Sequence, residues 1–230
     1  ASEWCRLANI PVGFKKGLYS ALLVLTLGML WPLHAFDNNG PMVVLGSAVL
    51  WWVVIFLLVV NYPKVRLLES RGFRAITGFW LLLPCWLALV TLHGKEESGP
   101  AYVLFLLTLI WVADSAAYFV GRQWGKKKMA PNVSPGKTLA GLWGALIGGA
   151  LWSAVGLVLL SPPQTVGFVL LCMVTVLFSV LGDLAESMFK RHAGVKDSGN
   201  ILPGHGGVLD RIDSITAAAP IFVFGLLLLE

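Results

Sequence analysis

Charged residues are scarce in this chain of 230 residues. Asp, Glu, Lys and Arg together make up 13% of it, hydrophobic residues make up 57%, and the mean hydropathy is +0.79. This composition excludes an ordinary soluble domain. Alternation of polar and apolar residues is also missing from the apolar segments, which argues against a membrane-spanning sheet.

Cysteine and the common nucleotide-binding motifs are scarce as well. The three cysteines are scattered and form no CxxC pair, so neither a disulfide framework nor a zinc site has support. Gly136-Lys137-Thr138 is similar to the end of a P-loop, but Pro131 occupies the position of the first required glycine. The CDP-alcohol phosphotransferase motif Asp-Gly-x-x-Ala-Arg is missing too.

The chain does contain long apolar runs. A helix needs about 20 apolar residues to cross about 30 Å of hydrocarbon. We predict an all-α polytopic transmembrane bundle in one integral-membrane domain over residues 1–230. The N-terminal helices are expected within 1–100, and the catalytic helices and cytoplasmic loops within 101–230. About seven spanning segments are predicted: 17–36, 42–62, 75–93, 101–121, 138–160, 165–182 and 214–229.

The basic residues follow the order of these segments. All but one of the 17 Lys and Arg residues lie before the first segment or in every second gap after it, and the exception is Lys95. This is the positive-inside pattern, and it predicts a cytoplasmic N-terminus and cytoplasmic polar loops. The net charge of +5 therefore reflects topology, and no nucleic-acid partner is expected.

One stretch, residues 187–213, is unusually polar for this chain, and we call it the polar block. Such polarity beside spanning segments typically marks a substrate or ion site. Acidic residues can hold a divalent cation, basic residues can hold phosphates, and glycines let the backbone approach a ligand. The block contains Ser187, Lys190, Arg191, Lys196, Asp197, Pro203, His205, Gly206, Gly207, Asp210, Arg211 and Asp213.

Helical spacing brings some of these side chains together. If the helix before the block continues, Asp183, Ser187 and Lys190 or Arg191 share one face, and Glu186 lies off it. Pairing of Asp183 with Lys190 at a solvated helix end is the simpler alternative.

Two further carboxylates are one turn apart. Asp210 and Asp213 can face one point, although Asp213 could instead cap a helix that begins at Ser214. Converging carboxylates suit a hard cation, so we predict Asp183 and Asp210 as the principal Mg²⁺ ligands and Asp213 as a third.

Other candidates lie in a loop and in a spanning segment. The loop around His205 can cradle a phosphate, or it can be a plain turn, and the roles open to His205 are phosphate contact, proton donor or loop support. Asp114 sits inside an apolar segment and is either functional or a structural hydrogen-bond partner.

The order and spacing of the polar block resemble the signature of the phosphatidate cytidylyltransferases. The resemblance extends upstream through Asp183 and, more loosely, to Asp114 and Ser134–Thr138. It implies joining of CTP and phosphatidic acid to give CDP-diacylglycerol and pyrophosphate. It further implies Mg²⁺, with a monovalent cation as a candidate second ion, a bacterial inner-membrane location and a homodimer. Further hydrophobic segments before residue 1 are expected from the family. The implied catalytic residues are Asp183, Lys190, His205 and Asp210, and the implied substrate contacts are Asp114, Lys137, Ser187, Arg191, Lys196 and Arg211.

Two other functions compete with this one. A CTP-dependent kinase of a polyprenol or similar alcohol needs the same grip on a cation and a triphosphate. A secondary transporter could also bury Asp114, but transporters usually show repeated halves, and this sequence shows no repeat.

Overall fold

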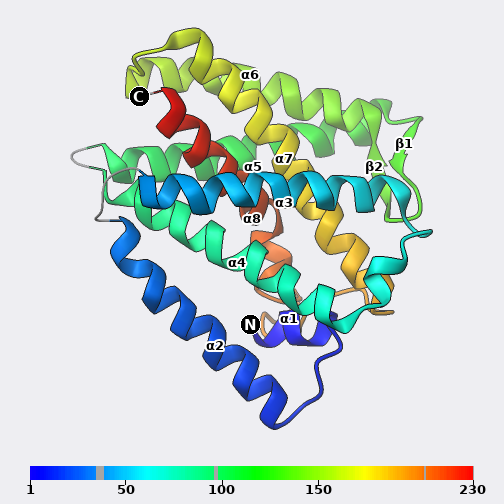
Figure 1. Ribbon diagram of the computed structural model, residues 1–230. Coiled ribbons are helices and arrows are strands. Elements are labelled where there is room, and N and C mark those ends of the chain that lie inside the picture. Colours follow the sequence, from blue (N-terminus) through cyan, green and yellow to red (C-terminus); the bar gives the residue numbers. More distant parts are fainter. Residues whose placement is uncertain (35–38, 96–97, 205, 230) are drawn as a thin grey trace.

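The computed structural model describes every residue except 35–38, 96–97, 205 and 230 (Figure 1). Most described residues are helical. The elements in chain order are α1 (Ser2–Leu7), α2 (Phe14–Leu30), η1 (Trp31–His34), α3 (Asn39–Asn61), η2 (Arg66–Glu69), α4 (Arg71–His93), α5 (Gly99–Trp124), β1 (Lys128–Ala130), β2 (Ser134–Thr138), α6 (Leu139–Leu160), α7 (Thr165–His192) and α8 (Leu209–Leu229).

Six of the described helices are long and apolar enough to cross a membrane: α3, α4, α5, α6, α7 and α8. The all-α polytopic architecture predicted from the sequence is confirmed. The first of the seven predicted segments differs, because α2 has only 17 residues and passes into the short 3-10 helix η1. Pro32 lacks the N–H that would continue an α-helical ladder at this point.

The last two spanning helices extend beyond their apolar segments into the polar block. α7 continues to His192, and α8 begins at Leu209. Asp213 therefore lies inside α8, and the alternative in which it caps a helix beginning at Ser214 is wrong. The sequence argument placed the helix start at the change in polarity, whereas the polar residues themselves form the first turn of α8.

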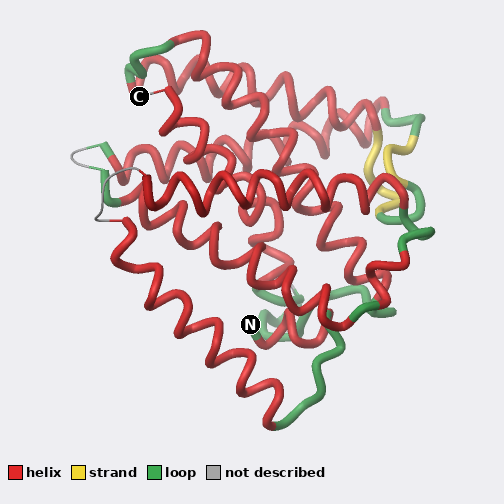
Figure 2. Tube along the Cα trace, in the orientation of Figure 1, coloured by secondary structure: helices red, strands yellow, loops and turns green. Residues whose placement is uncertain are grey.

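A small hairpin joins α5 to α6. Strands β1 and β2 pair antiparallel, with Lys128 opposite Thr138 and Ala130 opposite Ser134 (Figure 2). Thr138 ends the hairpin and caps α6, because its hydroxyl accepts the Gly141 N–H at 3.1 Å. The sequence argument against a sheet concerned the apolar segments, and the hairpin lies in the polar gap between two of them.

Helix α8 is the most buried of the six long helices and packs against α3, α4 and α7 (Figure 1). Its crossing with α7 is very close at Gly182. A side chain there would bring a Cβ to 2.5 Å from the Asp213 carbonyl oxygen, so only glycine fits. This contact holds the polar start of α8 against the end of the apolar part of α7.

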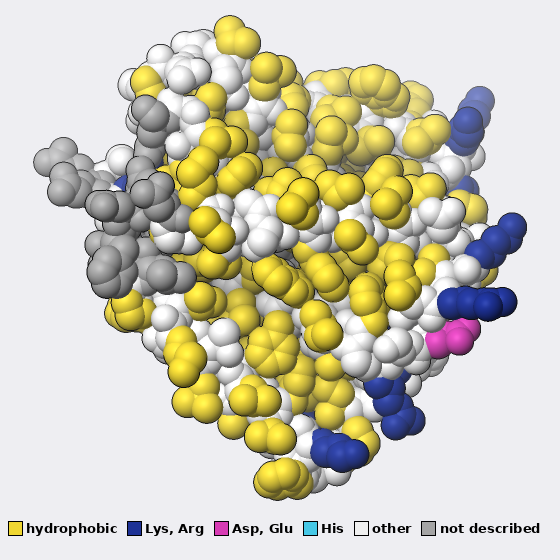
Figure 3. Space-filling model, in the orientation of Figure 1, with side chains coloured by type: hydrophobic (Ala, Val, Ile, Leu, Met, Phe, Trp, Pro, Cys, Tyr) yellow, Lys and Arg dark blue, Asp and Glu magenta, His cyan; other side chains and the backbone are white. Residues whose placement is uncertain are grey.

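The outer surface in the view of Figure 3 is largely hydrophobic, as expected for helices in lipid. Most of the Lys and Arg side chains visible in that view gather along one edge. Figure 1 places the hairpin and the end of α3 on the same side. Most of the basic side chains visible on this face thus lie at one end of the bundle (Figure 3).

Candidate active site

A polar cavity of about 870 Å³ opens at this end of the bundle, between α5, the hairpin, α7 and α8. A volume of this size accommodates a nucleotide or a drug-sized ligand. The elements around it contribute both acidic and basic side chains, among them Asp114, Arg122, Lys137, Asp183, Arg211 and Asp213. We call this space the polar cavity.

Lys137 and Asp183 form the central ion pair of the polar cavity. Lys137 Nζ lies 2.8 Å from Asp183 Oδ2 and also donates to the Val180 carbonyl oxygen at 3.2 Å. Asp183 Oδ1 lies 3.3 Å from the Ser187 hydroxyl, which donates to it. Asp183 therefore pairs with Lys137 from the hairpin, and the predicted alternative of a pair with Lys190 is wrong.

Lys190 belongs to a second, more buried group of charges. Its ammonium lies 2.5 Å from Glu186 Oε2 and 2.7 Å from Asp210 Oδ1. Only 11% of the Lys190 side chain, 4% of the Glu186 side chain and 7% of the Asp210 side chain are exposed. Lys190 is not among the residues that line the polar cavity. Its ammonium instead pairs with the carboxylates of Glu186 and Asp210.

Asp210 is almost fully occupied by donors from the protein. Besides Lys190, it accepts the backbone N–H of Gly207 at 2.7 Å, the backbone N–H of Ser198 at 3.0 Å and the Ser198 hydroxyl at 2.9 Å. A carboxylate has about four acceptor sites, so little capacity is left for a metal ion. Asp210 instead fastens the loop of the polar block to the start of α8.

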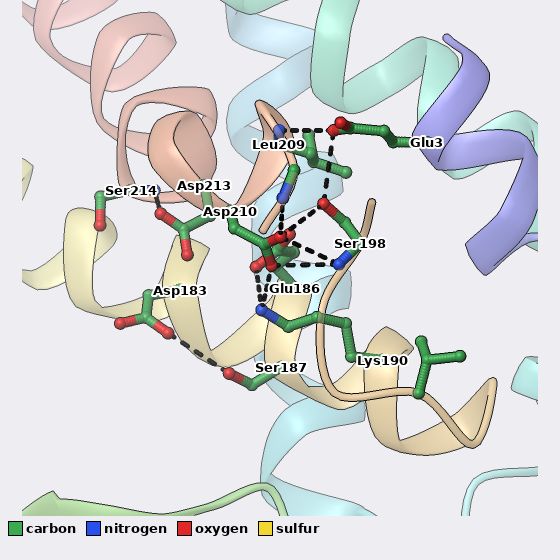
Figure 4. A network of polar contacts seen from close by, with 12 residues as sticks. Glu3, Asp183, Glu186, Ser187, Lys190, Ser198, Leu209, Asp210, Asp213 and Ser214 are labelled. Carbon is green, nitrogen blue, oxygen red and sulfur yellow. Dashed lines mark hydrogen bonds and ion pairs between the residues drawn. The ribbon is translucent and has the colours of Figure 1, made fainter. Parts of the chain in front are cut away.

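The carboxylates of Asp183 and Asp213 point in a different direction from the carboxylate of Asp210. Figure 4 shows their carboxylates on one side of the view, whereas Asp210 turns toward Lys190 and Ser198 on the other. Asp183, Asp213 and also Asp210 are among the residues that line the polar cavity. Asp213 Oδ1 accepts the Ser214 N–H at 2.8 Å. Of the predicted carboxylates, Asp183 and Asp213 are the two that share a direction.

Among the described residues, no group of three or more His, Cys, Asp or Glu side chains is arranged to hold a metal ion. Two carboxylates nevertheless suffice for Mg²⁺ when the remaining ligands are water and substrate phosphates. The oxygen donors of Asp183 and Asp213 fit this requirement, and the saturated carboxylate of Asp210 fits it less well. Magnesium at this site stays a prediction.

The remaining predicted residues are distributed unevenly. Asp114 and Arg211 line the polar cavity. Arg191 donates to the carbonyl oxygens of Val133 and Val195, at 3.4 Å and 3.5 Å, and so connects α7 with the hairpin turn. Lys196 is exposed and is not among the lining residues. The predictions for His205 lie outside the described residues.

Sequence reasoning missed several residues of this region. Glu186 was placed off the functional face, yet it is the i, i+4 partner of Lys190, a spacing visible in the sequence. Arg122 lines the polar cavity and donates to the Tyr118 hydroxyl at 3.1 Å. Asp114, Tyr118 and Arg122 follow one another at four-residue spacing, so the sequence did carry that signal. No sequence signal pointed to Ser198 or Glu3.

A second cavity of about 530 Å³ adjoins the polar one and is lined mainly by apolar residues. It lies between α3, the hairpin turn and α7, and we call it the apolar cavity. Met129, Leu142 and Val180 line both cavities, so the two lie side by side. Its rim includes exposed residues of α3, such as Phe56 and Val60.

Comparison with known proteins gives the family. The Cytidylyltransferase family profile matches residues 1–229, almost the whole chain. The chain belongs to the cytidylyltransferase family.

Relatives of this cytidylyltransferase-family chain are similar over most of its length. It is 43% identical over 190 residues to the phosphatidate cytidylyltransferase of Haemophilus influenzae, covering 77% of this chain and 66% of the relative. The enzyme of the same name from Pseudomonas aeruginosa is 41% identical over 225 residues, 96% of this chain and 81% of the relative. That of Brucella suis is 44% identical over 234 residues, 99% of this chain and 80% of the relative.

Proposed function

We propose that this protein is a phosphatidate cytidylyltransferase, which joins CTP and phosphatidic acid to give CDP-diacylglycerol and pyrophosphate. The observation that carries the proposal is that a polar and an apolar cavity lie side by side and share Met129, Leu142 and Val180 in their linings. A nucleoside triphosphate needs a polar environment such as the polar cavity, and the acyl chains of a lipid need an apolar one such as the apolar cavity. The names of the relatives support the same substrates.

The reaction requires one anionic phosphate to attack another. A phosphate oxygen of the lipid forms a bond to the α-phosphorus of CTP, and the bond from that phosphorus to the oxygen bridging to the β-phosphate breaks. Pyrophosphate leaves with the electron pair. Positioning and charge neutralisation supply most of the catalysis in such reactions.

The cations of the polar cavity fit this requirement. Lys137, Arg122 and Arg211 come from the hairpin, α5 and α8 respectively and surround one space. We assign Lys137 and Arg211 to the triphosphate and Arg122, at the end of α5, to the outer phosphates or the lipid phosphate. Asp183 and Asp213 are the residues that would hold Mg²⁺, which when bound neutralises part of the triphosphate charge.

The lipid fits the apolar cavity. Its lining by α3 and α7, with Phe56 and Val60 at an exposed rim, suits an acyl chain that enters from the bilayer. The distribution of basic residues supports a cytoplasmic position for the polar end, in a bacterial inner membrane. A homodimer stays a prediction from the family.

Two differently labelled nucleotides test the proposal. Purified protein is incubated with phosphatidic acid or with a polyprenol, together with Mg²⁺ and CTP labelled at the α- or the γ-phosphate, and the lipids are extracted. A cytidylyltransferase places the α label in the lipid and the γ label in pyrophosphate. Transfer of the γ label to a polyprenol, with release of CDP, would instead identify a lipid-alcohol kinase and overturn the proposal.

A further inference from the structure

The N-terminal helix α1 contacts the polar block directly through Glu3. This residue lies about 200 positions before the block in sequence, in a helix of only six residues. Figure 4 shows its side chain pointing from α1 toward Ser198 and Leu209. The contact calls for an explanation, because α1 forms no part of either cavity lining.

Helix α1 is firmly held against the bundle. Trp4 is 2% exposed, and its indole N–H donates to the Arg74 carbonyl oxygen at 2.8 Å. The Trp4 ring also packs edge-on against Phe189 of α7, with 5.0 Å between ring centroids. The position of Glu3 is therefore fixed by contacts with both α4 and α7.

The Glu3 carboxylate caps the start of α8. Oε1 accepts the Val208 N–H at 2.9 Å, and Oε2 accepts the Leu209 N–H at 2.7 Å. The first N–H groups of a helix have no partner within the helix, and a negative charge is favourable there. Glu3 supplies both from a distant part of the chain.

The same carboxylate reaches the residue that holds Asp210. The Ser198 hydroxyl lies 3.3 Å from Glu3 Oε2 and 2.9 Å from Asp210 Oδ2, and Ser198 is fully buried. One hydroxyl has one proton, so it donates to one carboxylate at a time, but it ties both to the same point of the loop. Asp210 in turn pairs with Lys190.

Two glycines of the polar block leave space for the Glu3 side chain. A Cβ on Gly199 would lie 2.6 Å from Glu3 Oε1, and a Cβ on Gly207 would lie 2.3 Å from Ser198 Oγ and 2.7 Å from Glu3 Cδ. Neither position tolerates a side chain without movement of the carboxylate. These glycines thus serve a contact within the protein, where the sequence alone suggested contact with a phosphate.

We propose that Glu3 is a positioning residue of the active site, which fixes the loop of the polar block to the start of α8 and thereby orients Asp210 and Lys190. Asp213 lies one turn further along α8 and faces the polar cavity, so a shift of this helix start displaces it as well. The effect on catalysis rests on the proposed function, whereas the effect on the loop does not.

Two measurements on the full chain test this inference separately. Hydrogen exchange over residues 198–209 reports the loop, and kcat with CTP and phosphatidic acid reports the site. In Glu3→Ala we expect exchange of the Val208 and Leu209 amides to rise about 10- to 100-fold. We expect kcat to fall about 10- to 100-fold, with a smaller change in the KM for CTP.

Graded variants and a control on the same helix sharpen the test. Glu3→Gln keeps an oxygen acceptor and Glu3→Asp keeps the charge, so both should retain more kcat than Glu3→Ala. Arg6→Gln changes an exposed side chain of α1 and should leave exchange and kcat unchanged. If Glu3→Ala folds poorly, Glu3→Gln carries the comparison.

The outcomes are distinguishable. If the wild-type protein makes no CDP-lipid, the proposed function fails, and the exchange measurement still decides whether Glu3 holds the loop. Wild-type exchange at Val208 and Leu209 in both Glu3→Ala and Glu3→Gln would overturn the inference. So would a lowered melting temperature together with a kcat within twofold of wild type, because Glu3 would then be only structural.

Discussion

Lys137 Nζ lies 2.8 Å from Asp183 Oδ2 and so connects the hairpin to helix α7 across the polar cavity. The pair is partly open to solvent, with 23% of the Lys137 side chain and 36% of the Asp183 side chain exposed. The Lys190–Asp210 pair is far more buried, at 11% and 7%. The first pair is therefore the more open to solvent and ligand and the second is largely enclosed by the protein, and the first two predictions depend on this difference in exposure.

The exposed pair should matter more for activity than for stability. Replacing Lys137 with Met removes a cation from the proposed triphosphate site, and we expect kcat/KM for CTP to fall about 100-fold. The free energy of unfolding should change by about 1 kcal/mol or less, because solvent screens a pair this exposed. Lys126→Met, at an exposed lysine that does not line the cavity, is the matched control. Equal losses in both variants would contradict the assignment.

The buried pair of Lys190 and Asp210 should matter for both activity and stability. Asp210→Ala leaves the ammonium of Lys190 with one carboxylate and removes an acceptor from Ser198 and Gly207. Loss of one partner from a buried pair costs about 3–5 kcal/mol of unfolding free energy. Thermal unfolding in detergent should therefore show a clear drop for Asp210→Ala and little change for Asp183→Ala. A drop of the same size in both would show that exposure does not distinguish the two pairs.

Arg122 should contribute to substrate binding even though it lies outside the polar block. In Arg122→Gln we expect the KM for one of the two substrates to rise about tenfold with a smaller change in kcat, since a contact equal in ground and transition states affects binding alone. Steady-state kinetics with each substrate varied in turn identifies which one. Tyr118→Phe removes only the hydroxyl that Arg122 contacts and should have a weaker effect. Unchanged KM values for both substrates would remove Arg122 from the site.

The apolar cavity should govern selection by acyl-chain length. Val60→Trp places a large ring at its rim, and we expect the KM for long-chain phosphatidic acid to rise several-fold. The KM for a short-chain lipid and the KM for CTP should stay near wild type. Leu57→Trp is the control, because Leu57 is exposed on the same helix and does not line the cavity. The same response in both variants, or a change in the KM for CTP, would place the acyl chains elsewhere.

The candidate site could be predicted in part. Asp183 and Asp213 were identified from the sequence because charges beside apolar segments are costly and therefore conspicuous, and Lys137 was identified from the family resemblance. The ranking of the carboxylates was not predictable, since it depends on which donors reach each oxygen. Asp210 ranked above Asp213 in the sequence, and both line the polar cavity, yet Ser198, Gly207 and Lys190 occupy Asp210 in the structure.

The sequence by itself determined that the chain forms a bundle of long apolar helices, because hydrocarbon accepts no unpaired backbone and few charges. It also determined which residues are concentrated in the polar block, and their spacing along α7. Only the tertiary structure decided which of these residues face the polar cavity and which pair with one another. The contact of Glu3 with Ser198 and Leu209 joins segments about 200 residues apart. Local periodicity relates only residues within a few turns, so such a contact follows from how the helices pack.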